Sequence, residues 1–271
     1  HRQQIYERIR EIEEFASPSY YALHWVNDKL FAMKKQPPLN QPMLVWLTDI
    51  NNPTTARTIL DLNSFDPEGR TSIDWYQPSP DGKMVGVSLS VAGTEEGDLH
   101  LFDTETGKQI DMIIPHVNGG TAGGDMAWLA DGSGFYYTRY PGEGERPEVD
   151  RHFYQQVWYH KLGTPVEKDH YVIGQDFPRI AEIRLEIQHP SNLLMLTVQY
   201  GDGGTFAFYL VKENRQWMQL AQYEDEIVET RFGPGNSLYL LSFKDAPHGK
   251  LLRLNLKSPE LNNAKVLIPE N

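Results

Sequence analysis

The histidines and other polar residues of this sequence include few arrangements that could do catalytic chemistry. The nine histidines are dispersed, and no H-E-x-x-H motif or Cys/His cluster provides metal-ligand spacing. The chain has no cysteine, which excludes disulfides, thiolate metal sites and cysteine nucleophiles. The sequence therefore predicts neither a metal centre nor a bound cofactor.

A serine nucleophile also lacks its usual motif. The segment 86–90 reads Gly-Val-Ser-Leu-Ser and so lacks the closing glycine of G-x-S-x-G. It lies in a predicted strand, whereas the nucleophile elbow is a turn from a strand into a helix. We therefore expect this polypeptide, on its own, to hydrolyse no peptide.

Three further features favour structural roles. Segment 119–124 is glycine-rich but lacks the Gly-Lys-Ser/Thr that cradles phosphate, so we read it as the entry into a strand. His160 lies in a predicted strand, where packing or hydrogen bonding is expected. The acidic clusters at 11–14, 143–150 and 224–229 are expected to be solvated surface, or else an acidic rim that attracts cationic peptides.

Composition narrows the class of protein. The 271 residues carry a formal net charge of −12, which argues against nucleic-acid binding, because phosphate contacts need clustered Lys and Arg. No apolar run approaches the roughly 18 residues of a membrane helix, so no membrane partner is expected. The absence of cysteine fits a cytoplasmic location, with the periplasm as the alternative. Because residue 1 is His, we expect a piece of a longer protein.

One amphipathic helix is expected at the start of the chain. Ile5, Ile9, Ile12 and Phe15 recur at helical spacing over residues 3–15, and the residue before Pro18 disfavours continuation. We assign residues 1–16 to this helix and its linker, and expect its apolar stripe to dock on another surface.

A repeat of four strands follows, over residues 17–271. Each unit begins with a strand, a tight Asn- or Gly-containing turn and a second strand; the turns fall at 27–29, 81–83, 131–133, 191–192 and 235–236. A period near 50 residues with four strands per unit is typical of a β-propeller, with an all-β sandwich as the weaker alternative. The predicted fold is therefore all-β, a β-propeller with a preceding short α-helix. Its five blades cover 20–62, 71–115, 121–174, 180–222 and 227–268.

Several motifs resemble one family. Residues 135–141 form an aromatic strand ending in Tyr-Pro, and 159–164 read Tyr-His-Lys-Leu-Gly-Thr. Segment 88–95 reads Ser-x-Ser-x-x-Gly-Thr-Glu, 126–128 reads Met-Ala-Trp, and 15–21 crosses from helix to strand. Together these segments resemble the N-terminal propeller of prolyl oligopeptidases.

The resemblance implies a seven-bladed propeller that covers a C-terminal α/β-hydrolase domain carrying Ser, Asp and His. By this comparison, about two blades and the whole hydrolase domain lie outside residues 1–271. The implied function is the non-catalytic propeller of a serine endopeptidase, which gates access of short peptides. The alternative is a stand-alone propeller that binds proteins or peptides without enzymatic activity.

The resemblance also marks three substrate-facing positions, at each of which this chain departs from the family. Gly123 stands where an aromatic residue is common, and Gln199 stands where a positively charged residue is common. Glu182 stands at a position that is usually hydrophobic. Cleavage after proline and cleavage after basic residues therefore both stay open.

An arc of five blades from a seven-bladed ring would leave two apolar faces uncovered. Since buried apolar surface stabilises by about 25 cal/mol per Å², such faces favour association. We therefore expect this polypeptide to self-associate when isolated.

Overall fold

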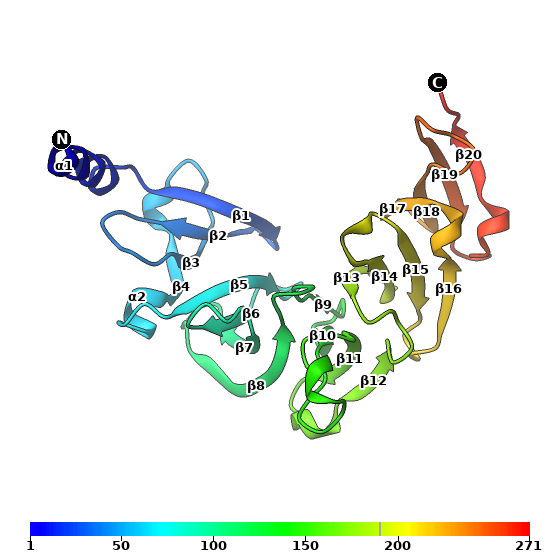
Figure 1. The fold of residues 1–271 in the computed structure, drawn as a ribbon, viewed down its shortest axis with the longest axis horizontal. Helices are drawn as coiled ribbons and strands as arrows, with labels where there is room; N and C mark the ends of the chain where they lie inside the picture. Colours follow the sequence, from blue (N-terminus) through cyan, green and yellow to red (C-terminus); the bar gives the residue numbers. More distant parts are fainter. Residues whose placement is uncertain (190) are drawn as a thin grey trace. The chain divides into compact units, whose positions relative to one another are not determined.

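The computed structural model describes residues 1–189 and 191–271, apart from the side chain of Glu13. A helix, α1 (Arg2–Glu14), precedes strands that form five antiparallel four-stranded sheets in the described part of the chain (Figure 1). In each sheet the strands are neighbours in chain order. The predicted all-β fold of five four-stranded units after a short helix is confirmed. No helix in the described ranges is long and apolar enough to span a membrane.

The chain divides into two compact units, and the first is His1–Asn118. Besides α1, it contains two sheets, which we call blades 1 and 2. Their strands are β1 (Ser19–Val26), β2 (Lys29–Lys35), β3 (Met43–Leu47), β4 (Arg57–Asp61), β5 (Thr71–Pro78), β6 (Met84–Val91), β7 (Gly97–Asp103) and β8 (Gln109–Asn118). A one-turn helix, α2 (Leu62–Phe65), links the two blades.

The second unit, Gly119–Asn271, contains blades 3, 4 and 5. Blade 3 is formed by β9 (Met126–Trp128), β10 (Gly134–Arg139), β11 (Gln156–Lys161) and β12 (His170–Ile173). Blade 4 is formed by β13 (Ala181–Gln188), β14 (Leu193–Tyr200), β15 (Phe206–Val211) and β16 (Trp217–Ala221). Blade 5 is formed by β17 (Ile227–Phe232), β18 (Ser237–Ser242), β19 (Lys250–Asn255) and β20 (Lys265–Ile268).

The turns have the backbone conformation that their residues predict. Asn27 and Asp28 both have positive φ, 46° and 60°, as a two-residue hairpin between β1 and β2 requires. Gly132 has φ +69° at the equivalent turn of blade 3. The strand β8 runs on to Asn118, beyond residue 115, where the sequence predicts the end of the second blade.

Apolar faces of consecutive blades pack against each other within each unit. In the first unit, Phe31 and Leu44 of blade 1 form one buried cluster with Val85 and Val87 of blade 2. In the second, two further clusters join blade 3 to blade 4 and blade 4 to blade 5. Burial of these faces is the main favourable term that holds neighbouring sheets together.

The amphipathic helix forms, but its apolar stripe is not buried in the structure. Ile5, Ile9 and Ile12 are each more than half exposed, and Phe15, just beyond the helix, is 83% exposed. That the stripe docks on another surface therefore stays a prediction.

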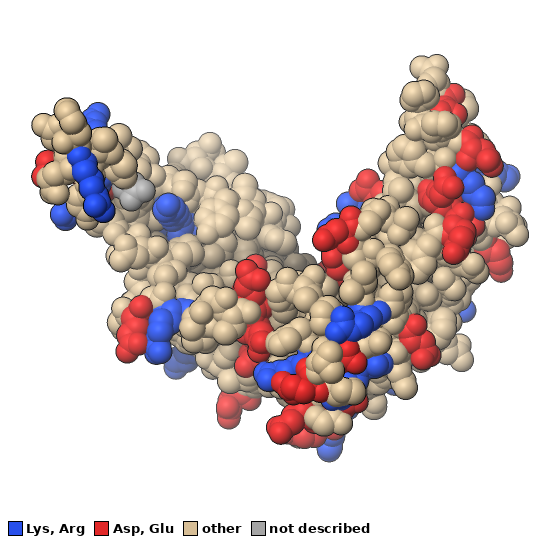
Figure 2. Space-filling view, viewed as in Figure 1, with Lys and Arg blue, Asp and Glu red and all other residues tan. Residues whose placement is uncertain are grey.

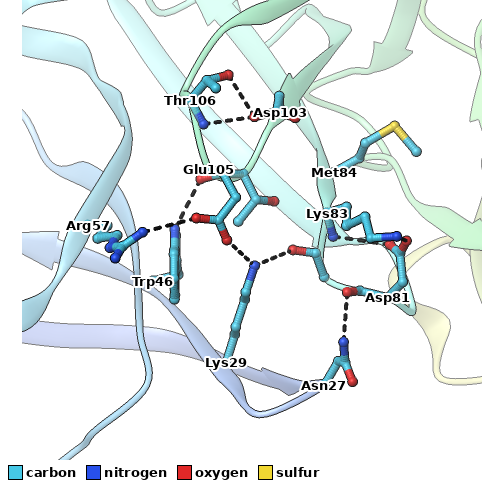
Figure 3. Close-up of polar contacts among 12 residues, drawn as sticks. Asn27, Lys29, Trp46, Arg57, Asp81, Lys83, Met84, Asp103, Glu105 and Thr106 are labelled. Carbon is cyan, nitrogen blue, oxygen red and sulfur yellow. Dashed lines mark hydrogen bonds and ion pairs between the residues drawn. The ribbon is translucent and has the colours of Figure 1, made fainter.

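A buried tryptophan joins blade 1 to blade 2 (Figure 3). The indole Nε1 of Trp46 donates a hydrogen bond of 3.0 Å to the carbonyl oxygen of Thr104. The Lys29 ammonium lies 4.4 Å from the centre of a Trp46 ring, and the Arg57 guanidinium lies 5.0 Å from the centre of a Trp46 ring. Both cations also contact the Glu105 carboxylate, at 2.6 and 3.0 Å. Blade 1 therefore holds the β7–β8 turn of blade 2 through an aromatic ring between two cations.

Replacement of Trp46 should destabilise the chain far more than loss of the adjacent ion pairs. Trp46→Ala removes a side chain that is 5% exposed, and such truncations cost about 3–5 kcal/mol. Glu105→Gln removes a carboxylate that is 48% exposed, and exposed pairs contribute about 1 kcal/mol or less. Urea unfolding of both variants measures the difference. Equal losses of unfolding free energy would contradict this assignment.

Candidate functional site

The first strand of blade 4 has an open edge, because β13 pairs only with β14. The backbone N–H groups of Ile183 and Leu185 point to this edge, since residues two apart in a strand project to the same side. Side chains from the blade 3 region accept both hydrogen bonds. Gln155 Oε1 lies 2.9 Å from Ile183 N, and Asp125 Oδ2 lies 2.7 Å from Leu185 N. Buried amides that would otherwise lack partners thus tie blade 4 to blade 3.

Gln155 also fixes the glycine-rich loop. Its side chain is fully buried, and its Nε2 donates a 3.0 Å hydrogen bond to the carbonyl oxygen of Gly123. One amide therefore bridges the loop before β9 to the start of β13. This bridge places the Gly123 loop beside Glu182, the neighbour of Ile183 in β13.

The loop around Gly123 is closed by its own hydrogen bonds. The N–H groups of Gly119 and Gly123 each donate to the carbonyl of the other residue, at 3.2 and 2.7 Å. The hydroxyl of Tyr140 accepts from Ala122 N at 3.0 Å and donates to Gly123 O at 3.2 Å. Gly123 has φ +62°, in the left-handed region that favours glycine. An aromatic residue, which the family commonly has at this place, would be strained in this backbone.

Glu182 and Gln199 are direct cross-strand partners in β13 and β14. The side chain of Gln199 turns to its own loop, where Nε2 donates to Gly201 O at 2.8 Å. Glu182 lines a cavity of about 200 Å³ beside the Gly123 loop. The cavity residues include Tyr140, Phe153, Ile180, Ala181, Glu182 and Asp202.

The cavity carries uncompensated negative charge. Burial, with the Asp202 carboxylate, raises the pKa of Glu182, and Arg184 offsets only part of this effect. Burial also raises the pKa of Tyr140, which lines the same cavity, and the charge on Glu182 adds to that rise.

The basic residue of the cavity, Arg179, already has partners. Its guanidinium lies 3.5 Å from the ring centre of Phe153. Its Nε contacts Asp150 at 2.8 Å, and a terminal nitrogen donates to the carbonyl of Val149 at 3.0 Å. Arg179 therefore holds the wall of the cavity in place and does not neutralise Glu182.

His160 has a structural role, as expected. Its Nδ1 lies 2.7 Å from Asp169 Oδ1, and the Tyr137 hydroxyl donates to Asp169 Oδ2 at 2.8 Å. The side chains of His160 and Asp169 are 1% and 4% exposed. A general base must reach a proton of its substrate, so this buried group is not a catalytic pair.

The described side chains of these sites surround a small cavity. Within the described ranges, no group of three or more His, Cys, Asp or Glu could hold a metal ion. On the face drawn in Figure 2, basic and acidic residues are interspersed and form no large basic patch. What the site offers is a small cavity with aromatic walls and two carboxylates.

Comparison with known proteins identifies the family. The family model for the prolyl oligopeptidase N-terminal β-propeller domain matches residues 1–271, the whole chain. The chain belongs to the prolyl oligopeptidase family.

Curated relatives and solved structures agree with this membership. The chain is 29% identical to a prolyl endopeptidase of Elizabethkingia meningoseptica over 221 residues, which cover 79% of this chain and 30% of that protein. It is 23% identical to prolyl oligopeptidase A of Amanita bisporigera, over 80% of this chain and 31% of that protein. The chain thus spans about a third of the length of these relatives.

Among solved structures, a prolyl endopeptidase matches with a TM-score of 0.84 and 20% identity, over 100% of this chain and 39% of that one. Prolyl oligopeptidase B from Galerina marginata, bound to a 35mer substrate, matches with a TM-score of 0.80 and 16% identity, over 99% of this chain and 40% of that one. At these identities the likeness shows the propeller fold alone.

The three positions named from the prolyl oligopeptidase resemblance lie in one region of the second unit. Glu182 lines the cavity, Gln199 pairs with it across the sheet, and the Gly123 loop contributes Thr121 and Ala122 to the wall. That they face substrate stays a proposal. Sequence reasoning missed Gln155, because nothing in its local pattern indicates a contact 28 residues away.

Asp125 should make stability depend on pH. Burial raises its pKa from 3.8 to about 6. Between these values the folded chain keeps a proton that the unfolded chain has lost, so its contribution to stability falls as pH rises from 4 to 6. The loss is on the order of 3 kcal/mol, at 1.36 kcal/mol per pKa unit.

Asp125→Asn removes the titration while keeping the size of the side chain. From pH 4 to 6, the unfolding free energy of the wild type should therefore fall relative to that of the variant. Denaturant unfolding at several pH values measures it. A difference that stays constant over this range would contradict the raised pKa.

Proposed function

We propose that this chain is the propeller part of a serine endopeptidase of the prolyl oligopeptidase type. The family match over all 271 residues carries this proposal. In it, a hydrolase domain of the same natural protein supplies the nucleophile, the base and the oxyanion hole, which peptide cleavage requires. The propeller covers that active site and limits access to short peptides.

The described residues favour a non-catalytic role for the chain. Ser88 and Ser90, the serines nearest to a nucleophile motif, donate hydrogen bonds to Asp74 at 2.7 and 2.6 Å within blade 2. Both serines are buried, and no histidine is hydrogen-bonded to either within residues 1–189 and 191–271. They hold a strand bulge at Asp74 in place and do not form an activated nucleophile.

In the proposed enzyme, the region of Gly123, Glu182 and Gln199 faces the substrate space. A glycine in place of an aromatic residue removes apolar contact area, and a glutamine in place of a basic residue removes a charge-assisted hydrogen bond. These differences act on peptide preference rather than on the chemical step.

The test uses the natural protein that contains this chain. We expect it to cleave a ten-residue peptide but not the same sequence within a folded protein. Replacing the serine of its G-x-S-x-G motif with alanine should abolish cleavage. Absence of any such motif, or equal cleavage of the peptide and the folded protein, would contradict the proposal and leave a binding scaffold.

Gln199→Arg tests the proposed substrate-facing position separately. The new charge should change the ratio of kcat/KM for acidic peptides to kcat/KM for neutral peptides by about tenfold. This factor corresponds to one charge-assisted hydrogen bond. Gln216→Arg, which adds the same charge at an exposed position in the β15–β16 turn, is the control. An equal change in both variants would assign the effect to overall charge and reject a substrate-facing Gln199.

A further inference from the structure

The cavity beside Glu182 has a chemical preference that follows from its lining. Its walls combine the rings of Tyr140 and Phe153 with the apolar side chains of Ile180 and Ala181. Glu182 and Asp202 add two carboxylates, and Arg179 adds a guanidinium. A volume of about 200 Å³ is below the range of about 300–1,000 Å³ usual for whole small-molecule ligands, so it suits a single side chain or chain end.

Both carboxylates are available to a ligand. Among the described residues, neither the Glu182 nor the Asp202 carboxylate has a side-chain hydrogen bond or an ion pair within 4 Å. Arg179 is occupied by Asp150 and by the carbonyl of Val149. Arg184, the other basic residue nearby, only partly offsets the repulsion between the two acids.

A bound cation would reduce the repulsion between the Glu182 and Asp202 carboxylates. The partly buried Glu182 carboxylate, beside the exposed Asp202 carboxylate, favours an added positive charge, because that charge lowers the cost of keeping both acids ionised. Aromatic faces next to a carboxylate attract an ammonium or a guanidinium group as well. An anionic group would be repelled by the two carboxylates, and a neutral donor would gain a hydrogen bond without the added attraction between charges.

We propose that this cavity is a subsite that binds a cationic group of the peptide, recognised by Glu182 and Asp202 between the aromatic walls. The group is either a Lys or Arg side chain or the free N-terminal ammonium. The inference rests on the proposed function, since it gives that peptide-facing region its selectivity.

The walls are positioned by contacts already described. Arg179 fixes Phe153 by stacking at 3.5 Å, and Gln155 fixes the Gly123 loop against the start of β13. The Tyr140 hydroxyl is held by Ala122 N and Gly123 O. A subsite with walls fixed in this way loses less entropy on binding than a mobile one.

The test measures the affinity of fluorescent hexapeptides for the natural protein that contains this chain, with the serine of its G-x-S-x-G motif replaced by alanine so that no peptide is cleaved. The parent peptide has one lysine and a free amino terminus. One variant peptide replaces lysine by norleucine, and another is acetylated at the amino terminus. We expect one of these changes to weaken binding by about tenfold or more, as loss of a hydrogen bond to a charged group does. Which change weakens binding identifies the source of the cation.

Protein variants then locate the effect. Glu182→Gln and Asp202→Asn keep side-chain size, and each should reduce the affinity ratio between the cationic and neutral peptides toward one. Glu167→Gln removes the same charge outside the cavity and should leave the ratio unchanged. Asp202 is exposed, so its variant serves if Glu182→Gln fails to fold.

Two results would overturn the inference. One is equal affinity for the cationic and neutral peptides in the protein with an unchanged cavity. The other is a preference that survives both Glu182→Gln and Asp202→Asn. Because binding is measured without cleavage, the two hypotheses fail separately. If the natural protein does not hydrolyse peptides, the proposed function is contradicted, but the affinity measurement can still be interpreted.

Discussion

The open edge of each blade's first strand is the constraint on which the site depends. An unpaired strand edge exposes N–H and C=O groups that must find partners when buried. In blade 4, Gln155 and Asp125 from the preceding blade's region provide the partners of Ile183 and Leu185. The need to give these edge amides hydrogen-bond partners therefore fixes how blade 3 packs against blade 4. The same contacts set the positions of the Gly123 loop and Glu182.

Polar contacts also cross the other blade junctions within each unit. The Tyr76 hydroxyl of β5 donates to the carbonyl of Ala22 in β1. The Gln188 side chain of β13 donates to the carbonyl of Gly235, in the β17–β18 turn, at 3.2 Å. Apolar burial supplies most of the energy between blades but is not directional. These few polar contacts add the direction that sets one blade against the next.

Local rules account for most of the fold but not for the site. The Asn27–Asp28 turn and Gly132 require positive φ, so their residue types alone predicted the hairpins. Asp125 contacts a backbone amide 60 residues away, and no local pattern marks such a partner. Glu182 was named through resemblance to the family, whereas Asp202 and Arg179 became visible only once the cavity was known.

Amide hydrogen exchange at the edge of β13 tests this account most directly. If Gln155 and Asp125 hold the edge, the Ile183 and Leu185 amides should exchange as slowly as those of Leu194 and Leu196 inside the blade 4 sheet. Residue-resolved exchange by NMR provides the comparison. Exchange of Ile183 and Leu185 at the rate of exposed loop amides would show that Gln155 and Asp125 do not protect these amides and would contradict the account.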